Sequence, residues 1–261
     1  LRGLEDSLGL TLMRRVGLAL ELTEAGARLA PDLTAGFAQI VEAVGGLKHD
    51  RASGPLRLSM LPTFAAHWLS PRLTRYPFER AGFDLLISTT QEAVDLSSGV
   101  ADVAVRHGTG TWEGTRADLL FDESVGLFGM PALAGLSAED MRARIEGMTL
   151  FLSQYRKENF ARWNATLPGG PIRPAAVMRV DSSGLALRAA MDGAGVALAG
   201  VEIADFDAAT GRLAELFSHR VPTGGGYYLV YPEALARDRR VRNLSRWMTE
   251  AAGQGRPGAS P

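Results

Sequence analysis

The chain of 261 residues contains no cysteine and only two lysines, Lys48 and Lys157. The lack of cysteine excludes a disulfide-stabilised scaffold, a thiolate zinc site and a cysteine nucleophile. The 28 basic side chains are matched by 29 acidic ones, which gives a formal net charge of -1. Such a balance excludes a polybasic protein that bulk charge alone would hold to nucleic acid or lipid.

Long hydrophobic runs are also missing. No apolar run reaches the roughly 18 residues that a membrane span needs. The N-terminus carries Glu5 and Asp6 where a signal peptide would have an unbroken apolar stretch. We therefore expect a cytoplasmic protein without a membrane partner. The first residue is Leu1 and not Met, so we expect the start of the native protein to be missing.

The sequence has none of the common short enzyme motifs. GxSxG, HExxH, GxxxxGK[ST] and a GxGxxG that opens a helix are all absent. Its four histidines (His49, His67, His107 and His219) are scattered without an i, i+4 partner, which is more typical of surface or packing histidines than of metal ligands. The Gly224–Gly226 run precedes a strand instead of opening a helix, which favours a flexible crossover over a phosphate loop. The sequence predicts no catalytic residue, cofactor or metal.

The first 50 or so residues have helical and hairpin patterns. Residues 1–8 are typical of the end of a helix that Gly9 stops, and residues 10–22 predict a short hairpin that turns around Gly17. Thr23 is a candidate N-cap for a helix from Glu24 to about Arg51, because apolar residues there recur three or four apart. This helix would be about 40 Å long. A second copy of the same helix is an economical partner for its apolar stripe.

A linker at residues 53–55 separates this region from an alternation of strands and helices. The predicted strands are 56–61, 83–89, 101–105, 148–152, 175–180, 196–199 and 227–231. The predicted helices are 65–76 with a break at Pro71, 138–146, 159–165, 185–192 and 234–252. The alternation predicts parallel sheets covered by helices, and its length favours two α/β lobes over one. The end of the chain, residues 251–261, is predicted to be disordered.

Three junctions between a strand and the next segment are candidate binding loops: 61–64, 105–108 and 181–184. In open α/β folds, ligands bind beyond the carboxyl ends of strands, against free helix N–H groups. The hydroxyls of Thr63, Ser182 and Ser183 suit a ligand carboxylate or amide. Alternatively, these hydroxyls cap their own helices. Phe64, Trp68 and Tyr227 are more typical of a core than of a ligand platform.

Seven motifs carry a resemblance to a known family. They are LEDSLGLTLMRR at 4–15, LTEAG at 22–26, LRLSMLPTFAAHWLSPRL at 56–73, DVAVRHGTGTWEG at 102–114, DSSGLALRAAMDGAGVALAG at 181–200, GRLAELF at 211–217 and GGYYLVYPE at 225–233. In this order they resemble the LysR-type transcriptional regulators over nearly the full length. The resemblance is closest to the subgroup of glycine-cleavage activators and β-lactamase regulators.

The resemblance implies an α/β fold with a two-lobed effector domain of the periplasmic-binding-protein type (type 2), preceded by a linker helix and a partial winged helix-turn-helix. Residues 1–23 would be the end of the recognition helix and the wing, and 24–53 the dimerising linker helix. Lobe I would comprise 54–128 and 228–250, and lobe II 129–227. The implied effector contacts are Thr63, Phe64, His107, Ser182, Ser183 and Tyr227.

The implied function is transcriptional regulation by a homodimer or homotetramer that senses a small polar effector, such as an amino acid or peptide-like molecule. Pro62, beside Thr63, has no backbone N–H to donate to an anionic ligand. The identity of the family's effectors therefore does not carry over directly to this chain. The complete protein would bind promoter DNA. In this chain only Arg14 and Arg15 remain as phosphate contacts, so we expect it to bind DNA poorly.

Two other classes of protein compete with this interpretation. A stand-alone small-molecule binding protein would have the same two lobes and no DNA-binding activity, but it would not need a linker helix. An enzyme on the same frame is disfavoured by the missing motifs. The arginines between Arg237 and Arg246 favour a solvated helix face over a nucleic-acid patch.

Overall fold

The structure is a computed structural model that describes residues 2–16, 19–48, 54–76 and 83–253. The chain divides into two compact units: Leu1–Ser53 with Ser98–Val100, and Gly54–Ser97 with Ala101–Pro261. No helix within the described ranges is long and apolar enough to cross a membrane. Each unit is described by itself below.

The first unit contains α1 (Arg2–Leu8), a hairpin of β1 (Met13–Val16) and β2 (Ala19–Leu22), and α2 (Glu24–Lys48). Gly9 follows α1 with a φ of 64°, as expected for a helix stop. The Gly17 turn and residues 49–51 of the predicted helix lie outside the described residues. The predicted helix end, the hairpin and the long helix are confirmed where they are described.

The start of α2 is fixed by the cap that the sequence predicts. The Thr23 hydroxyl oxygen accepts a hydrogen bond from the Gly26 N–H at 3.1 Å. The same hydroxyl donates to the Thr11 carbonyl oxygen at 2.7 Å. A Cβ on Gly26 would lie only 2.1 Å from the Leu12 carbonyl oxygen. Glycine at this position therefore lets the first turn of α2 approach the loop after α1.

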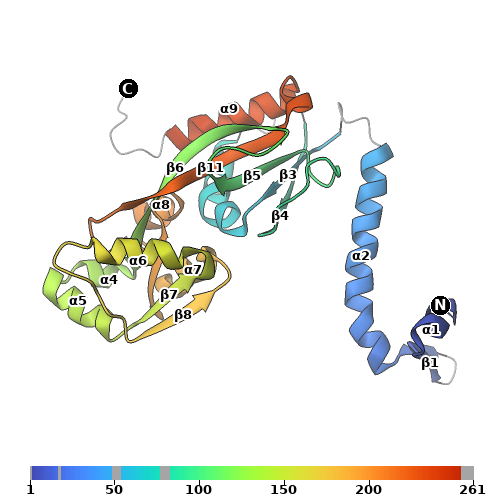
Figure 1. The fold of residues 1–261 in the computed structure, drawn as a ribbon, viewed down its shortest axis with the longest axis horizontal. Coiled ribbons are helices and arrows are strands. Elements are labelled where there is room, and N and C mark those ends of the chain that lie inside the picture. Colours follow the sequence, from blue (N-terminus) through green and yellow to red (C-terminus); the bar gives the residue numbers. More distant parts are fainter. Residues whose placement is uncertain (1, 17–18, 49–53, 77–82, 254–261) are drawn as a thin grey trace. The chain divides into compact units, whose positions relative to one another are not determined.

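The second unit is built on one mixed sheet in the order β4-β3-β5-β11-β6-β9-β7-β8 (Figure 1). One parallel group contains β3 (Leu56–Met60), β4 (Leu85–Thr89) and β5 (Val103–Gly108). The other contains β7 (Thr149–Ser153), β8 (Ala176–Val180) and β9 (Gly195–Gly200). Two long antiparallel strands join them, β6 (Thr115–Gly129) and β11 (Val221–Pro232), and β10 (Ala214–Glu215) pairs with β6.

The prediction of parallel sheets is correct for two groups of strands and wrong for the strands that join them. The parallel groups match the predicted strands, but β6 was not predicted, and its pairs with β11 and β9 are antiparallel. A long β6 beside a long β11 gives the unit a continuous two-stranded connection between its halves, which Figure 1 shows in green and orange-red.

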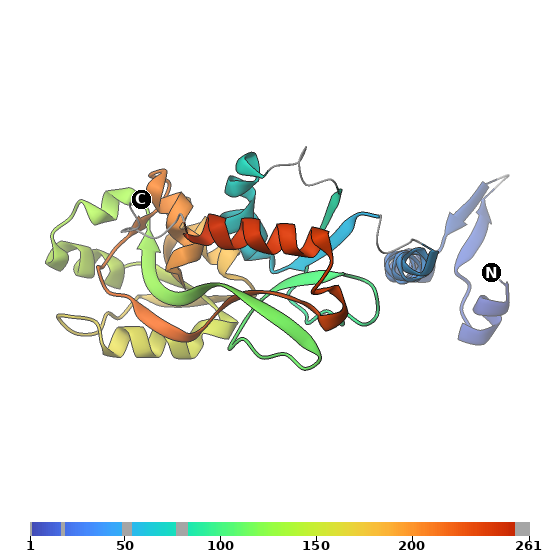
Figure 2. The ribbon, with the colours of Figure 1, turned by 90° about the horizontal axis from the view of Figure 1, so that it is seen from above.

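Helices cover the sheet. They are α4 (Pro131–Ala134), α5 (Ala138–Glu146), α6 (Lys157–Ala165), α7 (Ser183–Met191), α8 (Val201–Ala209) and α9 (Arg239–Gly253), with short 3₁₀ turns at Gln154–Arg156 and Glu233–Leu235. Figure 2 shows α9 lying along the two long strands. Helix α8 was not predicted. Because α9 continues to Gly253, the predicted disordered tail is wrong for residues 251–253, and the rest of it lies outside the described residues.

The predicted helix 65–76 is irregular. Its first part, Phe64–Leu69, is a π-helix in which the Ser70 N–H donates to the Ala65 carbonyl, and Ser70–Arg75 is a 3₁₀ helix. Pro71 has no N–H to continue the α-helical hydrogen bonds, which explains why the pattern changes next to it.

Two hydrophobic clusters form the core of the second unit. The larger one contains Phe64, Trp68, Phe121 and Tyr227, whose rings stack or tilt against one another with centroids 4.6 to 6.3 Å apart. The smaller one surrounds the fully buried Trp163. The two clusters fit the expected two-lobed architecture.

Candidate functional site

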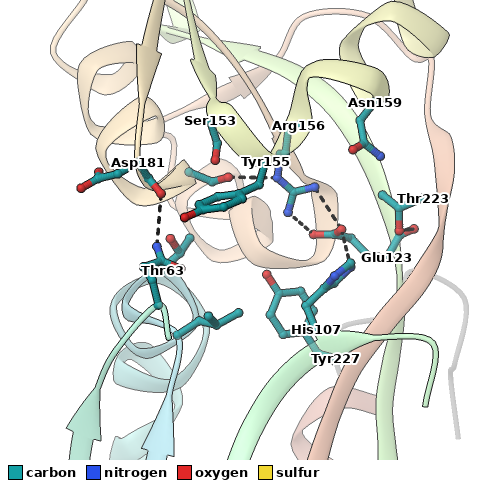
Figure 3. Close-up of a pocket in the computed structure, with 13 residues that line it drawn as sticks. Thr63, His107, Glu123, Ser153, Tyr155, Arg156, Asn159, Asp181, Thr223 and Tyr227 are labelled. Atoms are coloured by element: carbon teal, nitrogen blue, oxygen red, sulfur yellow. Dashed lines mark hydrogen bonds and ion pairs between the residues drawn. The ribbon is translucent and has the colours of Figure 1, made fainter. Parts of the chain in front are cut away.

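A cavity of about 320 Å³ lies where the two halves of the sheet meet (Figure 3). Its wall contains residues that follow strands β3, β7 and β8, together with residues of β5, β6 and β11. The lining residues are Leu61, Thr63, Gln91, His107, Glu123, Ser153, Tyr155, Arg156, Asn159, Asp181, Ser183, Thr223 and Tyr227. Hydroxyls, amides and charged groups predominate, so the cavity suits a polar ligand.

A buried ion pair lies in the wall of the cavity. The Glu123 side chain on β6 is completely buried, and the Arg156 side chain is 12% exposed. Arg156 Nη2 lies 2.6 Å from Glu123 Oε1 and Nη1 lies 3.0 Å from Oε2, which is a bidentate arrangement. His107 Nε2 is 2.9 Å from Glu123 Oε2. Figure 3 shows Arg156 and His107 converging on this one carboxylate.

The charges of this pair stabilise each other. Burial by itself raises the pKa of Glu123, but the charge of Arg156 and hydrogen bonds from His107 and Arg156 outweigh burial and lower this pKa to about 2. Burial by itself lowers the pKa of Arg156, and the Glu123 carboxylate reverses the effect and raises it. Both groups are therefore ionised at neutral pH.

The same arginine also ties two other segments to the site. Arg156 Nε donates to Ser183 Oγ at 2.9 Å, at the start of α7. The next residue along, Gly184, donates its N–H to Thr63 Oγ1 at 3.0 Å. Together with the ion pair to Glu123 of β6, these two bonds connect the turn after β7, the start of α7 and Thr63, three residues after β3.

Close packing explains one glycine beside the pair. A Cβ on Gly200, at the end of β9, would lie 2.4 Å from Glu123 Oε1. Any larger residue would displace the carboxylate from Arg156 unless β9 moved.

Tyr227 on β11 lines the cavity beside His107. Its ring meets the His107 ring edge-on at 5.2 Å and stacks on Phe64 at 5.3 Å. Burial, reinforced by the Glu123 charge, raises the pKa of the Tyr227 hydroxyl, so this group stays protonated as a hydrogen-bond donor.

The structure brings together four of the six effector contacts expected from the sequence: Thr63, His107, Ser183 and Tyr227. The expectation that Phe64 and Ser182 face the cavity is not met. Phe64 is fully buried among aromatic rings, and Ser182 caps α7 by accepting the Leu185 N–H at 3.2 Å. The capping alternative thus holds for Ser182. It is wrong for Thr63, which makes no cap bond in its own helix.

Sequence reasoning missed the two central residues, Glu123 and Arg156. A signal existed for Arg156, because it lies three residues after β7 and the rule on carboxyl ends of strands applies to that junction too. Glu123 lies inside a strand, and only its contact with an arginine 33 residues away reveals its role.

The two arginines predicted to contact DNA lie on β1. Arg14 is exposed and lies 3.8 Å from Glu21 on β2, and Arg15 is exposed beside it. The structure describes only α1 and the hairpin of the expected winged helix-turn-helix.

Comparison with known proteins adds to this geometry. Residues 49–253 match the family described as the LysR substrate binding domain. The glycine cleavage system transcriptional activator of Escherichia coli is 30% identical over 254 residues, which cover 97% of this chain and 83% of that protein. The chain belongs to the LysR family of transcriptional regulators.

Other LysR-family members support the same assignment. The HTH-type transcriptional activator AmpR of Rhodobacter capsulatus is 33% identical over 248 residues, or 94% of this chain and 83% of that protein. The structure of the AmpR effector binding domain from Citrobacter freundii aligns with a TM-score of 0.64 and 28% identity, covering 77% of this chain and 99% of that domain. The second unit is thus a LysR-type effector domain, and the cavity lies within it.

Proposed function

We propose that this LysR-family regulator responds to a small polar effector, an amino acid or peptide-like molecule, bound in the cavity beside Glu123 and Arg156. The observation that carries the proposal is the buried pair itself. A buried ion pair is costly to desolvate, and burying it contributes little net stability. Its placement in the wall of a polar cavity is better explained by ligand recognition and by coupling of the segments that it joins.

The groups left available to a ligand define its chemistry. Arg156 already makes a bidentate pair with Glu123, so it does not offer a free fork for a carboxylate. The hydroxyls of Thr63, Ser183 and Tyr227 and the His107 ring offer mixed donors and acceptors. This set suits peptide and amino groups that both donate and accept hydrogen bonds.

A thermal-shift series tests the effector site. D- and L-amino acids, alanyl dipeptides and soluble muropeptides would each be added to the wild type and to Thr63→Val and Ser183→Ala. We expect at least one compound to raise the melting temperature of the wild type, and we expect both variants to lose most of that shift. The exposed Ser137, which caps α5 away from the cavity, supplies a control variant, Ser137→Asn. A shift that survives in both cavity variants would contradict the assignment.

We further propose the arrangement of the whole regulator: head 1–23, dimerising linker 24–53, lobe I 54–128 with 228–250, and lobe II 129–227. It acts as a homodimer or homotetramer on promoter DNA, and hence in the cytoplasm. Arg14 and Arg15 supply phosphate contacts, supported by their exposure on β1. With the full-length protein and its own upstream DNA, Arg14→Ala and Arg15→Ala should each reduce the salt slope of binding by about one. Unchanged slopes would exclude these contacts.

A further inference from the structure

Arg106 is a half-buried cation without an acidic partner among the described residues. It lies between Val105 and His107 on β5. Because successive residues of a strand point to opposite faces, Arg106 faces the side of the sheet away from His107. Its guanidinium donates only to uncharged oxygens: Val105 O at 2.9 Å, Ser59 Oγ at 2.9 Å and Glu92 O at 3.4 Å. Burial lowers the pKa of Arg106, and no charge within the described part of the chain opposes that effect.

This situation is unlike that of Arg156. Burial removes water from Arg156, and the bidentate pair with the Glu123 carboxylate replaces the lost hydrogen bonds. Arg106 loses hydration and retains two N–H groups, on Nε and Nη1, that reach no acceptor in the residues that the structure describes. A half-buried guanidinium with unused donors can hold an external anion.

A cavity of about 500 Å³ adjoins Arg106. The loop 93–97 and the loop 112–115 form its sides, and Ala104, Val230 and Pro232 of the sheet form its floor. Val94, Leu96 and Val230 give it an apolar lining, and Trp112 contributes an aromatic wall. The volume lies within the ordinary range for a small organic ligand.

The Trp112 ring packs against Tyr228 and Gly108. The Trp112 ring meets the Tyr228 ring edge-on at 5.5 Å. A Cβ on Gly108 would lie 2.8 Å from the Trp112 ring, so glycine is what allows the loop to lie this close to β5. Gly110, between Gly108 and Trp112, has a φ of 91°, a conformation that favours glycine.

We propose that this cavity binds a small organic monocarboxylate with an apolar or aromatic body, which Arg106 holds by its carboxylate and Trp112 by its ring. Asp95 and Glu113 also line the cavity and disfavour ligands of higher negative charge, such as phosphates. The site is separate from the effector cavity, and the adjacent residues Arg106 and His107 of β5 connect the two faces of the sheet.

Benzoate and benzamide are matched probes, because they share a shape and differ in charge. We expect benzoate to bind the wild type at least roughly tenfold more tightly than benzamide in calorimetric titration at constant ionic strength, since a charge-assisted hydrogen bond is worth a factor of about ten or more. Arg106→Gln should abolish this difference, and Arg106→Lys should retain part of it. Arg237→Gln, at an exposed arginine, is the control and should bind as the wild type does.

Indole N–H resonances locate the bound probe independently of the arginine variants. Of the four tryptophans, Trp112, assigned with Trp112→Phe, should shift most on adding benzoate to the wild type. Thr63→Val and Ser183→Ala should leave benzoate binding unchanged, which separates this site from the effector cavity. Equal binding of the two probes, retention in Arg106→Gln, a larger shift of another indole or loss of binding in the effector-cavity variants would each overturn the proposal.

Discussion

At the residue scale, Glu123 should contribute to stability mainly by neutralising the buried positive charge of Arg156. Glu123→Gln removes the charge and leaves a guanidinium that is only 12% exposed without its carboxylate. Breaking a buried pair from one side costs about 3–5 kcal/mol. We therefore expect the free energy of unfolding, measured by urea titration, to fall by about 3 kcal/mol.

An exposed ion pair provides the matched control for Glu123. Arg116 and Glu233 lie 2.7 Å apart, but their side chains are 57% and 66% exposed. Glu233→Gln should change the free energy of unfolding much less than Glu123→Gln does, because solvent screens an exposed pair. If the two substitutions had equal effects, the buried pair would have no special role in stability.

The low pKa of Glu123 also predicts how stability changes with pH. The carboxyl has a pKa of about 2 in the folded protein against an ordinary value of 4.5. The unfolded chain therefore binds the proton more readily, and the stabilisation is complete above pH 4.5 and is lost as the pH falls from there to about 2. Urea titrations of the wild type at several pH values should show a steep loss in this window. Glu123→Gln should show a shallower one, and parallel curves would contradict the prediction.

At the scale of elements, the two serines at the start of α7 should separate stability from binding. Ser182 caps the helix, and Ser183 accepts a hydrogen bond from Arg156. Ser182→Ala should lower the free energy of unfolding by about 1 kcal/mol and leave effector binding unchanged. Ser182→Asn, which keeps a capping group, should restore the stability. Loss of effector binding in both Ser182 variants would place this serine in the site.

The same elements show what the sequence could predict. Strand Leu56–Met60 alternates apolar and polar residues after a linker, and Thr149–Ser153 contains a short apolar run after a helix end, so local patterns identify both. Strand β6 is different, because Asp122, Glu123 and Ser124 interrupt its apolar residues. Glu123 pairs with the distant Arg156 and lines the cavity, and the Ser124 N–H donates to Glu202. No local pattern reveals such contacts. Helix α8 follows β9 directly after Gly200, with no turn residues to mark a new element.

The candidate site likewise contains residues that local sequence rules identify and residues that only the folded structure brings together. Thr63 and Ser183 lie at strand-to-helix junctions, where the rule on carboxyl ends of strands finds them from the sequence. The order of the chain does not reveal that Glu123, His107 and Arg156 meet at one carboxylate. That meeting depends on the antiparallel register of β5, β11 and β6, in which Tyr227 lies opposite both His107 and Phe121.

At the scale of the whole molecule, α2 presents an apolar stripe that requires a partner. Leu33, Phe37 and Ile40 recur at helical spacing and are 38%, 62% and 58% exposed within their unit. Large apolar side chains aligned in this way mark an interaction surface, and a second α2 offers a matching stripe. A symmetric pair of linker helices is therefore the expected contact between two copies of the chain.

Sedimentation equilibrium tests this contact. Phe37→Asp and Ile40→Asp place a charge in the stripe, and each should weaken dimerisation by a factor of about 30 or more, the effect of losing an interface residue worth 2 kcal/mol. Thr34→Asp adds the same charge about a quarter of a turn away on the helix, and it should have a much smaller effect. The effector cavity lies in the other unit, so all three variants should keep their thermal shift with effector. A wild type that stays monomeric at tens of micromolar, or a Thr34→Asp variant that dissociates as readily as Phe37→Asp, would rule out the stripe as the dimer contact.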